Sequence, residues 1–303
     1  MHTDLPPTID SVAAARWARQ LPQQSAWLHD EVARRMEERL QWIVRTPANW
    51  LHWSPLTGGL QVQELLARRY PAATCFVHQA HAAQLRAVQE RWAKGWWSPA
   101  RWTGPKVRFD GPAGPVQMLW ANMALHMEAD PLALIRSWHE ALDVDGFLMF
   151  SCLGPDTLLE LRQLYAREGW QAPSHDFTDM HDWGDMLVGA GFAEPVMDME
   201  RITLTFSSAT RMLEELRGLG RNLPRNRYSG LRTRLWRQRF QHAISEDSGM
   251  QSDDGRLQLT FEVIYGHAFK PTPRIAVRGE STVSLQQMRQ ALSASKARSG
   301  QER

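Results

Sequence analysis

The sequence has few cysteines, almost no net charge and no long apolar run. Its 303 residues include only Cys75 and Cys152, and each lies in an apolar stretch typical of a buried strand. Two such residues favour core thiols over a disulfide or a metal site, so a reducing compartment fits the chain. No window approaches the roughly 20 apolar residues of a membrane span, and the first residues include no apolar leader. We therefore expect a cytoplasmic protein with no membrane partner.

The charge balance limits the partners of the chain. It has 35 basic and 33 acidic residues, a net charge of +2, which is too near neutral for a protein that wraps nucleic acid along its whole length. Any basic partner site must be local. The apolar content of 43% at this length is enough for a sizeable core, which excludes a wholly disordered chain.

Short apolar runs alternate with helical periodicities in the first half of the chain. Strands are predicted at residues 50–53, 74–77, 116–121 and 146–153, with helices at 60–69, 82–94 and 131–142. This order predicts an α/β fold with a mostly parallel sheet that is covered on both faces. Such sheets bind ligands beyond the carboxyl ends of their strands, so the loops after these strands form the candidate site.

The flanking segments predict further elements and a domain organisation. Two helices, separated at Pro22, are expected within residues 12–45, and we interpret residues 1–45 as a helical lid. We expect residues 46–270 to form the main domain, with a basic helical insertion at about 208–245, and residues 271–303 to be a polar, disordered tail. Later elements are predicted at 180–190 (helix), 195–199, 202–206 and 257–267 (strands), whereas the Trp-rich residues 92–102 show no clear period.

Several motifs in the second half of the chain are jointly specific. They read LGPDTL (153–158), DMHDWGDMLVGAGF (179–192) and EVIYGHA (262–268), and EVARRMEERL (31–40) accompanies them. With these motifs the chain resembles the malonyl-[acyl-carrier protein] O-methyltransferases of biotin synthesis. The resemblance implies a Rossmann-like class I methyltransferase fold with seven strands, the last antiparallel, and a helical insertion before that strand. It also implies S-adenosylmethionine as the methyl donor and malonyl-acyl carrier protein as the acceptor.

The loop after the first strand departs from the family pattern. Class I methyltransferases resemble D-x-G-x-G-x-G here, whereas this chain reads HWSPLTG, with Ser54 and Leu56 at the first two glycine positions. We expect Leu56 to place a branched side chain where the backbone should pass close to the cofactor. Gln79 stands where the family has a ribose-binding acid, and its hydrogen bond is weaker than that of a carboxylate. By resemblance, the predicted cofactor-binding residues are Ser54, Thr57, Gly58, Gly59, Gln79 and Asn122.

Histidines and acids do not predict a catalytic triad or a metal centre. His181, Asp182 and Asp185 lie close together, but acids at a helix N-terminus explain them better than a metal site. We interpret His126 as a polar residue near a strand end and His175 as a surface residue. No catalytic residue is assigned, because an ionised carboxylate attacks a methyl donor directly and needs alignment more than a general base.

A local cluster of arginines predicts a partner surface. Nine arginines lie between Arg211 and Arg239. Carrier proteins present acidic helices, so such a cluster fits acyl carrier protein, although a solvated helical face remains an alternative. Nucleic acid is disfavoured, because no aromatic interleaving or recognised binding motif accompanies the cluster. We assign the carrier contact to Arg221, Arg225 and Arg227, since the Asn and Pro residues around them indicate a loop.

Three hypotheses follow from the sequence. The first is an active methyltransferase with a divergent cofactor pocket, which the well-kept motifs of the second half favour. The second is a pseudo-methyltransferase that has lost S-adenosylmethionine and acts as a carrier-protein-binding or regulatory protein. The third is a methyltransferase that acts on a different acid.

Overall fold

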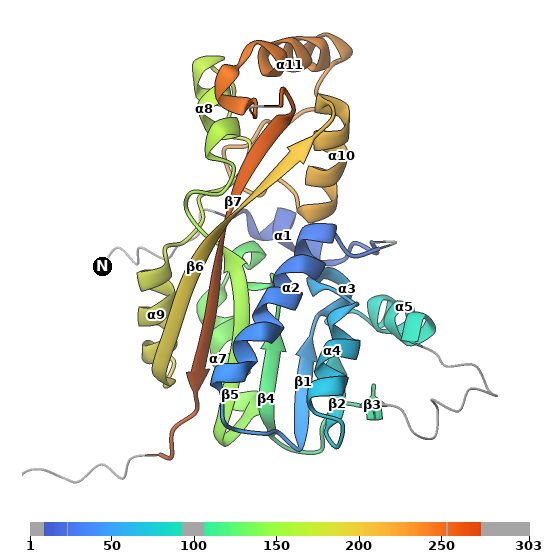
Figure 1. Ribbon diagram of the computed structural model, residues 1–303, viewed down its shortest axis with the longest axis vertical. Helices are drawn as coiled ribbons and strands as arrows, with labels where there is room; N and C mark the ends of the chain where they lie inside the picture. Colours follow the sequence, from blue (N-terminus) through green and yellow to red (C-terminus); the bar gives the residue numbers. More distant parts are fainter. Residues whose placement is uncertain (1–8, 23, 93–105, 253, 274–303) are drawn as a thin grey trace, which may run out of the picture. The chain divides into compact units, whose positions relative to one another are not determined.

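A computed structural model describes residues 9–22, 24–92, 106–252 and 254–273 (Figure 1). The chain divides into two units, residues 1–271 and 272–303, and only the first two residues of the second unit are described. From residue 274 onwards, the predicted polar tail therefore lies outside the described residues. So does most of the Trp-rich segment, including Trp96, Trp97 and Trp102.

The described strands form one seven-stranded sheet in the order β3-β2-β1-β4-β5-β7-β6. Neighbours from β3 to β5 run parallel, whereas β7 is antiparallel to both β5 and β6. The predicted mostly parallel sheet with an antiparallel last strand is confirmed. The strands are β1 (Asn49–Trp53), β2 (Thr74–His78), β3 (Lys106–Arg108), β4 (Val116–Ala121), β5 (Leu142–Leu153), β6 (Ala193–Phe206) and β7 (Leu257–Phe269).

Helices cover both faces of the sheet and divide the core into two main clusters. One cluster joins Met36 of α2 and Leu66 of α4 to Trp120 on one face, and the other contains Trp138 of α7 and Trp183 of α9 on the opposite face. The α-helices are α1 (Ser11–Ala18), α2 (Trp27–Arg39), α3 (Pro55–Gly58), α4 (Val62–Arg69), α5 (Ala82–Trp92), α7 (Pro131–Ala141), α8 (Leu159–Arg167), α9 (Met180–Gly189), α10 (Ala209–Leu219) and α11 (Arg234–Glu246). The described residues also form short 3-10 helices: η1 (Leu40–Trp42), η2 (Leu125–Met127) and η3 (Ser248–Met250).

Polar side chains begin several of these helices. Asp10 accepts hydrogen bonds from the first turn of α1, and Asp130 precedes Pro131 at the start of α7. Asp179 Oδ1 accepts from the His181 amide at 2.8 Å, so this acid caps α9.

The strands β6 and β7 extend beyond the rest of the sheet as a two-stranded ribbon (Figure 1). Pairing with β5 ends at Leu153, opposite Val263, while β6 and β7 remain paired as far as Phe206 and Leu257. The prediction of two separate strands at 195–199 and 202–206 was wrong, because Glu200 and Arg201 stay in register with β7. The side chains of Glu200 and Arg201 are not fully buried, so both can stay charged while their backbone continues the strand.

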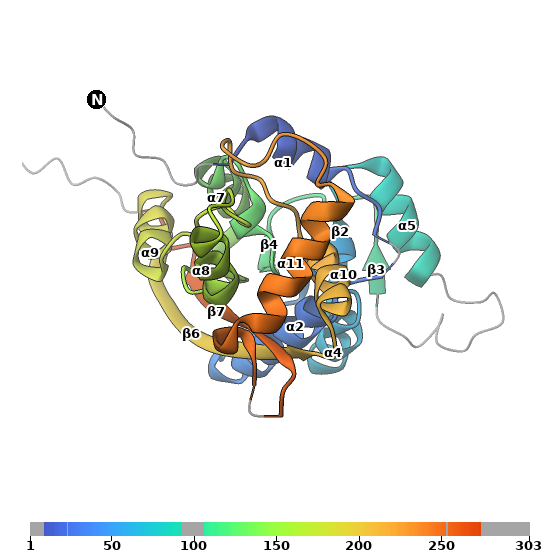
Figure 2. The same ribbon diagram turned by 90° about the horizontal axis from the view of Figure 1, so that it is seen from above.

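The insertion between β6 and β7 holds two helices rather than one helical segment. α10 and α11 are separated by residues 220–233, which begin with a glycine and include Pro224. Figure 2 shows α8, α10 and α11 gathered over the carboxyl ends of the parallel strands. The insertion therefore covers the edge of the sheet at which a ligand site is expected.

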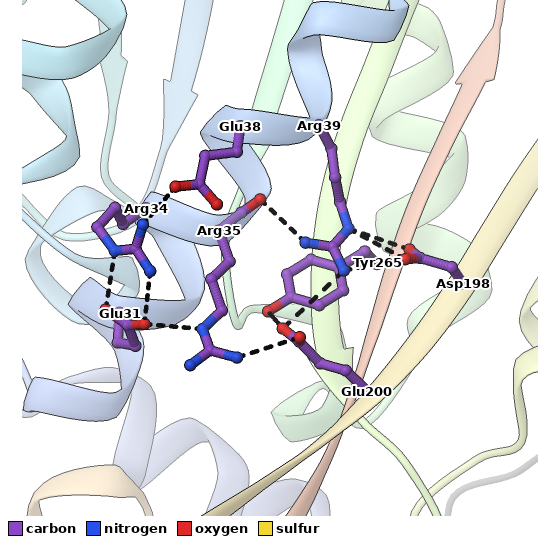
Figure 3. A network of polar contacts seen from close by, with 8 residues as sticks. All are labelled: Glu31, Arg34, Arg35, Glu38, Arg39, Asp198, Glu200 and Tyr265. Atoms are coloured by element: carbon purple, nitrogen blue, oxygen red, sulfur yellow. Dashed lines mark hydrogen bonds and ion pairs between the residues drawn. The ribbon is translucent and has the colours of Figure 1, made fainter.

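A network of charged side chains joins α2 to the β6–β7 ribbon (Figure 3). Arg35 Nη1 lies 3.1 Å from Glu200 Oε2, and Arg39 Nη2 lies 2.9 Å from Asp198 Oδ2. The guanidinium of Arg39 lies 3.7 Å from the centre of the Tyr265 ring, and the Tyr265 hydroxyl donates to Glu200 at 2.5 Å. The network fixes α2 against β6 and β7.

Glu31 lies at one end of this network, so its removal should weaken the fold. Hydrogen bonds from Arg34, and then from Arg35, lower the pKa of Glu31 from 4.5 to about 2. We expect Glu31→Gln to lower the free energy of unfolding at pH 7 by about 1 kcal/mol. Because the folded-state pKa is depressed, the advantage of the parent should shrink as the pH falls from 4.5 towards 2.

Urea unfolding at successive pH values measures this difference. Glu38→Gln is the matched control, because Glu38 is 55% exposed and, among the residues that the structure describes, forms an ion pair with Arg34 alone. A parent advantage that does not change between pH 7 and pH 3, or that is equal for both variants, would contradict the assignment.

Candidate functional site

A cavity of about 370 Å³ lies at the carboxyl ends of β1, β2 and β4. Ser54 and Thr57 line it from the loop after β1, Gln79 from the end of β2 and Met123 from the loop after β4. Trp17 of α1 lies on a further side. The cavity is therefore at the position predicted for a ligand of a parallel sheet.

The loop after β1 keeps a turn despite its missing glycines. Ser54 adopts a left-handed conformation, with φ of 50°, which glycine reaches at lower cost. Leu56 is fully buried in the core cluster and does not line the cavity. The expectation that Leu56 intrudes on the cofactor was wrong, because the short helix α3 turns its side chain inward.

Asn122 joins this loop to the rest of the site. Its Nδ2 donates to the backbone oxygens of His29, at 2.8 Å, and of Gly58, while its Oδ1 accepts from Ser151 Oγ at 2.6 Å. A Cβ on Gly58 would lie 2.6 Å from the backbone oxygen of Asn122, so only glycine fits there. We call Asn122, Gly58, His29 and Ser151 the Asn122 junction.

The structure separates the six predicted cofactor residues into two groups. Ser54, Thr57 and Gln79 line the cavity. Gly58 and Asn122 lie behind its wall, in the Asn122 junction. Gly59, with φ of 114°, packs against α2 instead of the cavity.

Two side chains of the cavity have buried polar atoms without a partner. Gln79 Nε2, at the end of β2, is one. His29 is the other: its Nδ1 lies 2.7 Å from the Thr57 carbonyl, which can only accept, so Nδ1 carries the hydrogen. This leaves His29 Nε2 as an unpaired acceptor. Burial lowers the pKa of His29 and favours the neutral ring.

Sequence reasoning missed His29 and Trp53. His29 follows Leu28 on the buried face of α2, and a polar residue at such a position is the signal that could have found it. Trp53 lines the cavity and stacks on His78 with ring centres 3.8 Å apart. His52 is buried at the end of β1, where its Nδ1 lies 3.1 Å from Gln63 Oε1, outside the cavity.

A second cavity, of about 230 Å³, adjoins the first. Met127 and Leu219 line both. His126 and His175 line the second, and His175 Nε2 donates to the His126 backbone oxygen at 2.8 Å. The prediction that His175 is a surface residue was wrong: it is 3% exposed, because the loop between α8 and α9 folds inward over η2.

The three predicted carrier-protein arginines differ in their surroundings. Arg227 Nη1 lies 2.7 Å from Asp10 Oδ2, and this pair joins the insertion to the N-terminal segment. Arg221 donates to the Gly220 oxygen at 2.9 Å and lies 5.1 Å from the centre of the Trp17 ring. Arg225 is exposed in the 220–233 loop.

Neither a candidate metal centre nor a membrane-spanning helix occurs in the described part of the chain. Across residues 9–22, 24–92, 106–252 and 254–273, His, Cys, Asp and Glu form no group of three or more that could hold a metal ion. Within the same residues, no helix has the length and apolar character needed to cross a membrane.

Comparison with known sequences gives consistent relatives. A malonyl-[acyl-carrier protein] O-methyltransferase from Gallionella capsiferriformans is 38% identical over 269 residues, which cover 86% of this chain and 89% of the relative. A protein of the same name from Laribacter hongkongensis is 37% identical over 262 residues, covering 83% and 85%. No protein-family model matches the chain.

Comparison with solved structures gives the same fold. A Bacillus halodurans protein provisionally assigned as a methyltransferase superposes with a TM-score of 0.52 and 15% identity, covering 80% of this chain and all of that one. The YcgJ protein of Bacillus subtilis has a TM-score of 0.52 at 13% identity, covering 80% and 99%. At such identities the likeness shows the class I methyltransferase fold alone.

The Asn122 junction generates a stability prediction. Asn122→Ala leaves a buried hydroxyl and two backbone oxygens without their partner, so we expect a loss of about 2–4 kcal/mol in the free energy of unfolding. Asn226→Ala is the control, because Asn226 is exposed in the 220–233 loop. Chemical denaturation measures both, and equal stabilities of the two variants would show that the junction is not needed.

Proposed function

The chain belongs to the malonyl-[acyl-carrier protein] O-methyltransferase family, and on that premise we propose that it methylates the free carboxylate of malonyl-acyl carrier protein in biotin precursor synthesis. The observation that supports this proposal best is the cavity at the carboxyl ends of β1, β2 and β4. Buried free thiols at Cys75 and Cys152 fit a cytoplasmic enzyme.

The residues of the first cavity fit S-adenosylmethionine. Gln79 has an unpaired amide nitrogen and an amide oxygen that can hydrogen-bond the ribose hydroxyls. Ser54 and Thr57 bring the loop after β1 to the same cavity, and the flat ring of Trp53 offers an apolar surface. We assign Ser54, Thr57 and Gln79 to direct contact with the cofactor.

Methylation of a carboxylate does not require a general acid or base from the protein. Bound S-adenosylmethionine supplies an activated methyl group, and an ionised carboxylate accepts it without a general base. The side chains therefore have to bind both molecules, align them and exclude water. The sequence motifs contain no catalytic triad, and binding, alignment and exclusion of water do not need one.

The alternatives from the sequence receive less support. A pseudo-methyltransferase that has lost its cofactor was motivated by the missing glycines, but Leu56 packs in the core and leaves the cavity open. The identity of 38% over most of the chain favours an active enzyme with the family's acceptor over one that acts on a different acid.

Cofactor binding can be tested without an acceptor. We expect S-adenosylhomocysteine to bind one-to-one in calorimetry, and Gln79→Ala to weaken it by about three- to tenfold through the loss of a ribose hydrogen bond. Gln238→Ala, an exposed position on α11, is the matched control and should bind like the parent. A folded parent protein that binds no S-adenosylhomocysteine at millimolar concentration would contradict the proposed methyltransferase function.

Acyl carrier protein is the proposed macromolecular partner. Its acidic helices would meet the basic insertion, in which Arg221, Arg225 and Arg227 lie in the loop between α10 and α11. The exposed Arg225 is the side chain best able to contact a partner directly. Arg227, paired with Asp10, contributes mainly to the position of the loop.

Carrier binding should depend on Arg225 and on salt. We expect Arg225→Ala to raise the Kd for malonyl-acyl carrier protein by about two- to fivefold, the effect of ~0.5–1 kcal/mol, and to reduce the dependence of Kd on salt. The control is Arg108→Ala, at an exposed arginine of β3 paired with Asp110. Surface plasmon resonance at several salt concentrations measures both, and identical behaviour of the two variants would refute the assignment.

A further inference from the structure

The second cavity lies between α8, α10 and the start of the β6–β7 ribbon. Apolar side chains form one side of it: Leu158, Leu161 and Tyr165 from α8 and the residues before it, with Phe261 of β7. Figure 2 shows these elements over the sheet edge that carries the first cavity. The cavity has a volume of about 230 Å³, which is enough for a short acyl group. It is too small to enclose the whole pantetheine chain that links such a group to a carrier protein.

The two cavities meet at one wall. Met127 follows η2 and Leu219 ends α10, and both line the first and the second cavity. A molecule in the second cavity that reaches this wall lies next to any ligand of the first. The two cavities thus provide places for two reactants side by side.

Two polar side chains of the second cavity, Ser174 and His126, lie close to this wall, and further polar residues line the cavity from α10 and the loop after it: Arg217, Arg221 and Asn222. His126 is adjacent to Met127 in sequence, and His175 donates to the His126 backbone oxygen, which brings Ser174 to the same place. Ser174 is 7% exposed and His126 is 3% exposed. Neither Ser174 Oγ nor His126 Nδ1 has a hydrogen-bond partner within the described residues.

Unpaired buried polar groups are costly unless a ligand supplies the missing partner. A carboxylate suits them, because it only accepts hydrogen bonds, and both a hydroxyl and a neutral imidazole N–H can donate. Burial, followed by the neighbouring His29 and His175, holds the pKa of His126 well below its ordinary value and favours the neutral ring. These neutral donors can orient a carboxylate, and Arg217 and Arg221, which also line the cavity, favour its ionised form.

We propose that the second cavity is the acceptor site, in which Ser174 and His126 bind the free carboxylate of a short acyl thioester beside the Met127–Leu219 wall. The apolar side receives the methylene and the thioester. His175 is a positioning residue, because it acts through the His126 backbone. This inference rests on the proposed function and adds the acceptor residues to it.

Ser174→Ala is the sharpest test, because the Ser174 hydroxyl has no partner that the fold requires. Methyl transfer is measured with malonyl-pantetheine thioester, a probe that omits the carrier-protein surface. We expect the KM for this probe to rise about tenfold, with kcat changed much less, as for the loss of a hydrogen bond to a charged group. The thermal stability should be unchanged or higher.

Second variants keep the test independent of folding. His126→Leu should raise the same KM, and His126→Gln, which keeps an N–H donor, should raise it less. Ser245→Ala, at an exposed serine of α11, is the matched control. Calorimetry with S-adenosylhomocysteine should give the same Kd for every variant.

The outcomes separate this inference from the proposed function. If S-adenosylhomocysteine binds and Ser174→Ala has the KM of the parent, the acceptor assignment is overturned while the proposed function stands. If the parent binds no S-adenosylhomocysteine, the proposed function itself fails. A selective rise in the KM for the thioester supports the acceptor site.

Discussion

The arrangement of the site depends on the hydrogen bonds of one buried amide, that of Asn122. It joins the backbone of α2, the loop after β1 and Ser151 of β5, three segments far apart in sequence. The contact with the loop requires that Gly58 has no side chain. A buried polar group of this kind stabilises only when all its partners are present. Ser54, Thr57 and the cavity they line therefore take their positions from Asn122.

This constraint explains how a glycine-poor loop still forms a cofactor cavity. The one glycine that the Asn122 junction requires, Gly58, is kept, and the other family glycines are replaced where the backbone tolerates a side chain. Ser54 adopts the left-handed conformation itself, and Leu56 contributes its side chain to the core. The departures from the family motif therefore change the core packing of the loop after β1 more than they change the cavity that this loop lines.

Much of the fold, and less of the site, could be predicted from the sequence. The buried strands of the parallel sheet appear in the sequence as apolar runs, and the helix predicted at 180–190 matches α9. The single strand β6 was missed, because Glu200 and Arg201 interrupt its apolar pattern while their partners, such as Arg35 of α2, are distant in sequence. His29 and His175 were missed for the same reason: burial by remote segments leaves no local pattern.

The central claim is that two adjoining cavities bring a methyl donor and a carboxylate acceptor together. The most direct measurement incubates the purified protein with S-adenosylmethionine and malonyl-acyl carrier protein and follows the acyl group by mass spectrometry. The account predicts a methyl ester on the malonyl group, formed only when both molecules are present. A folded protein that binds S-adenosylhomocysteine yet forms no malonyl methyl ester would contradict it.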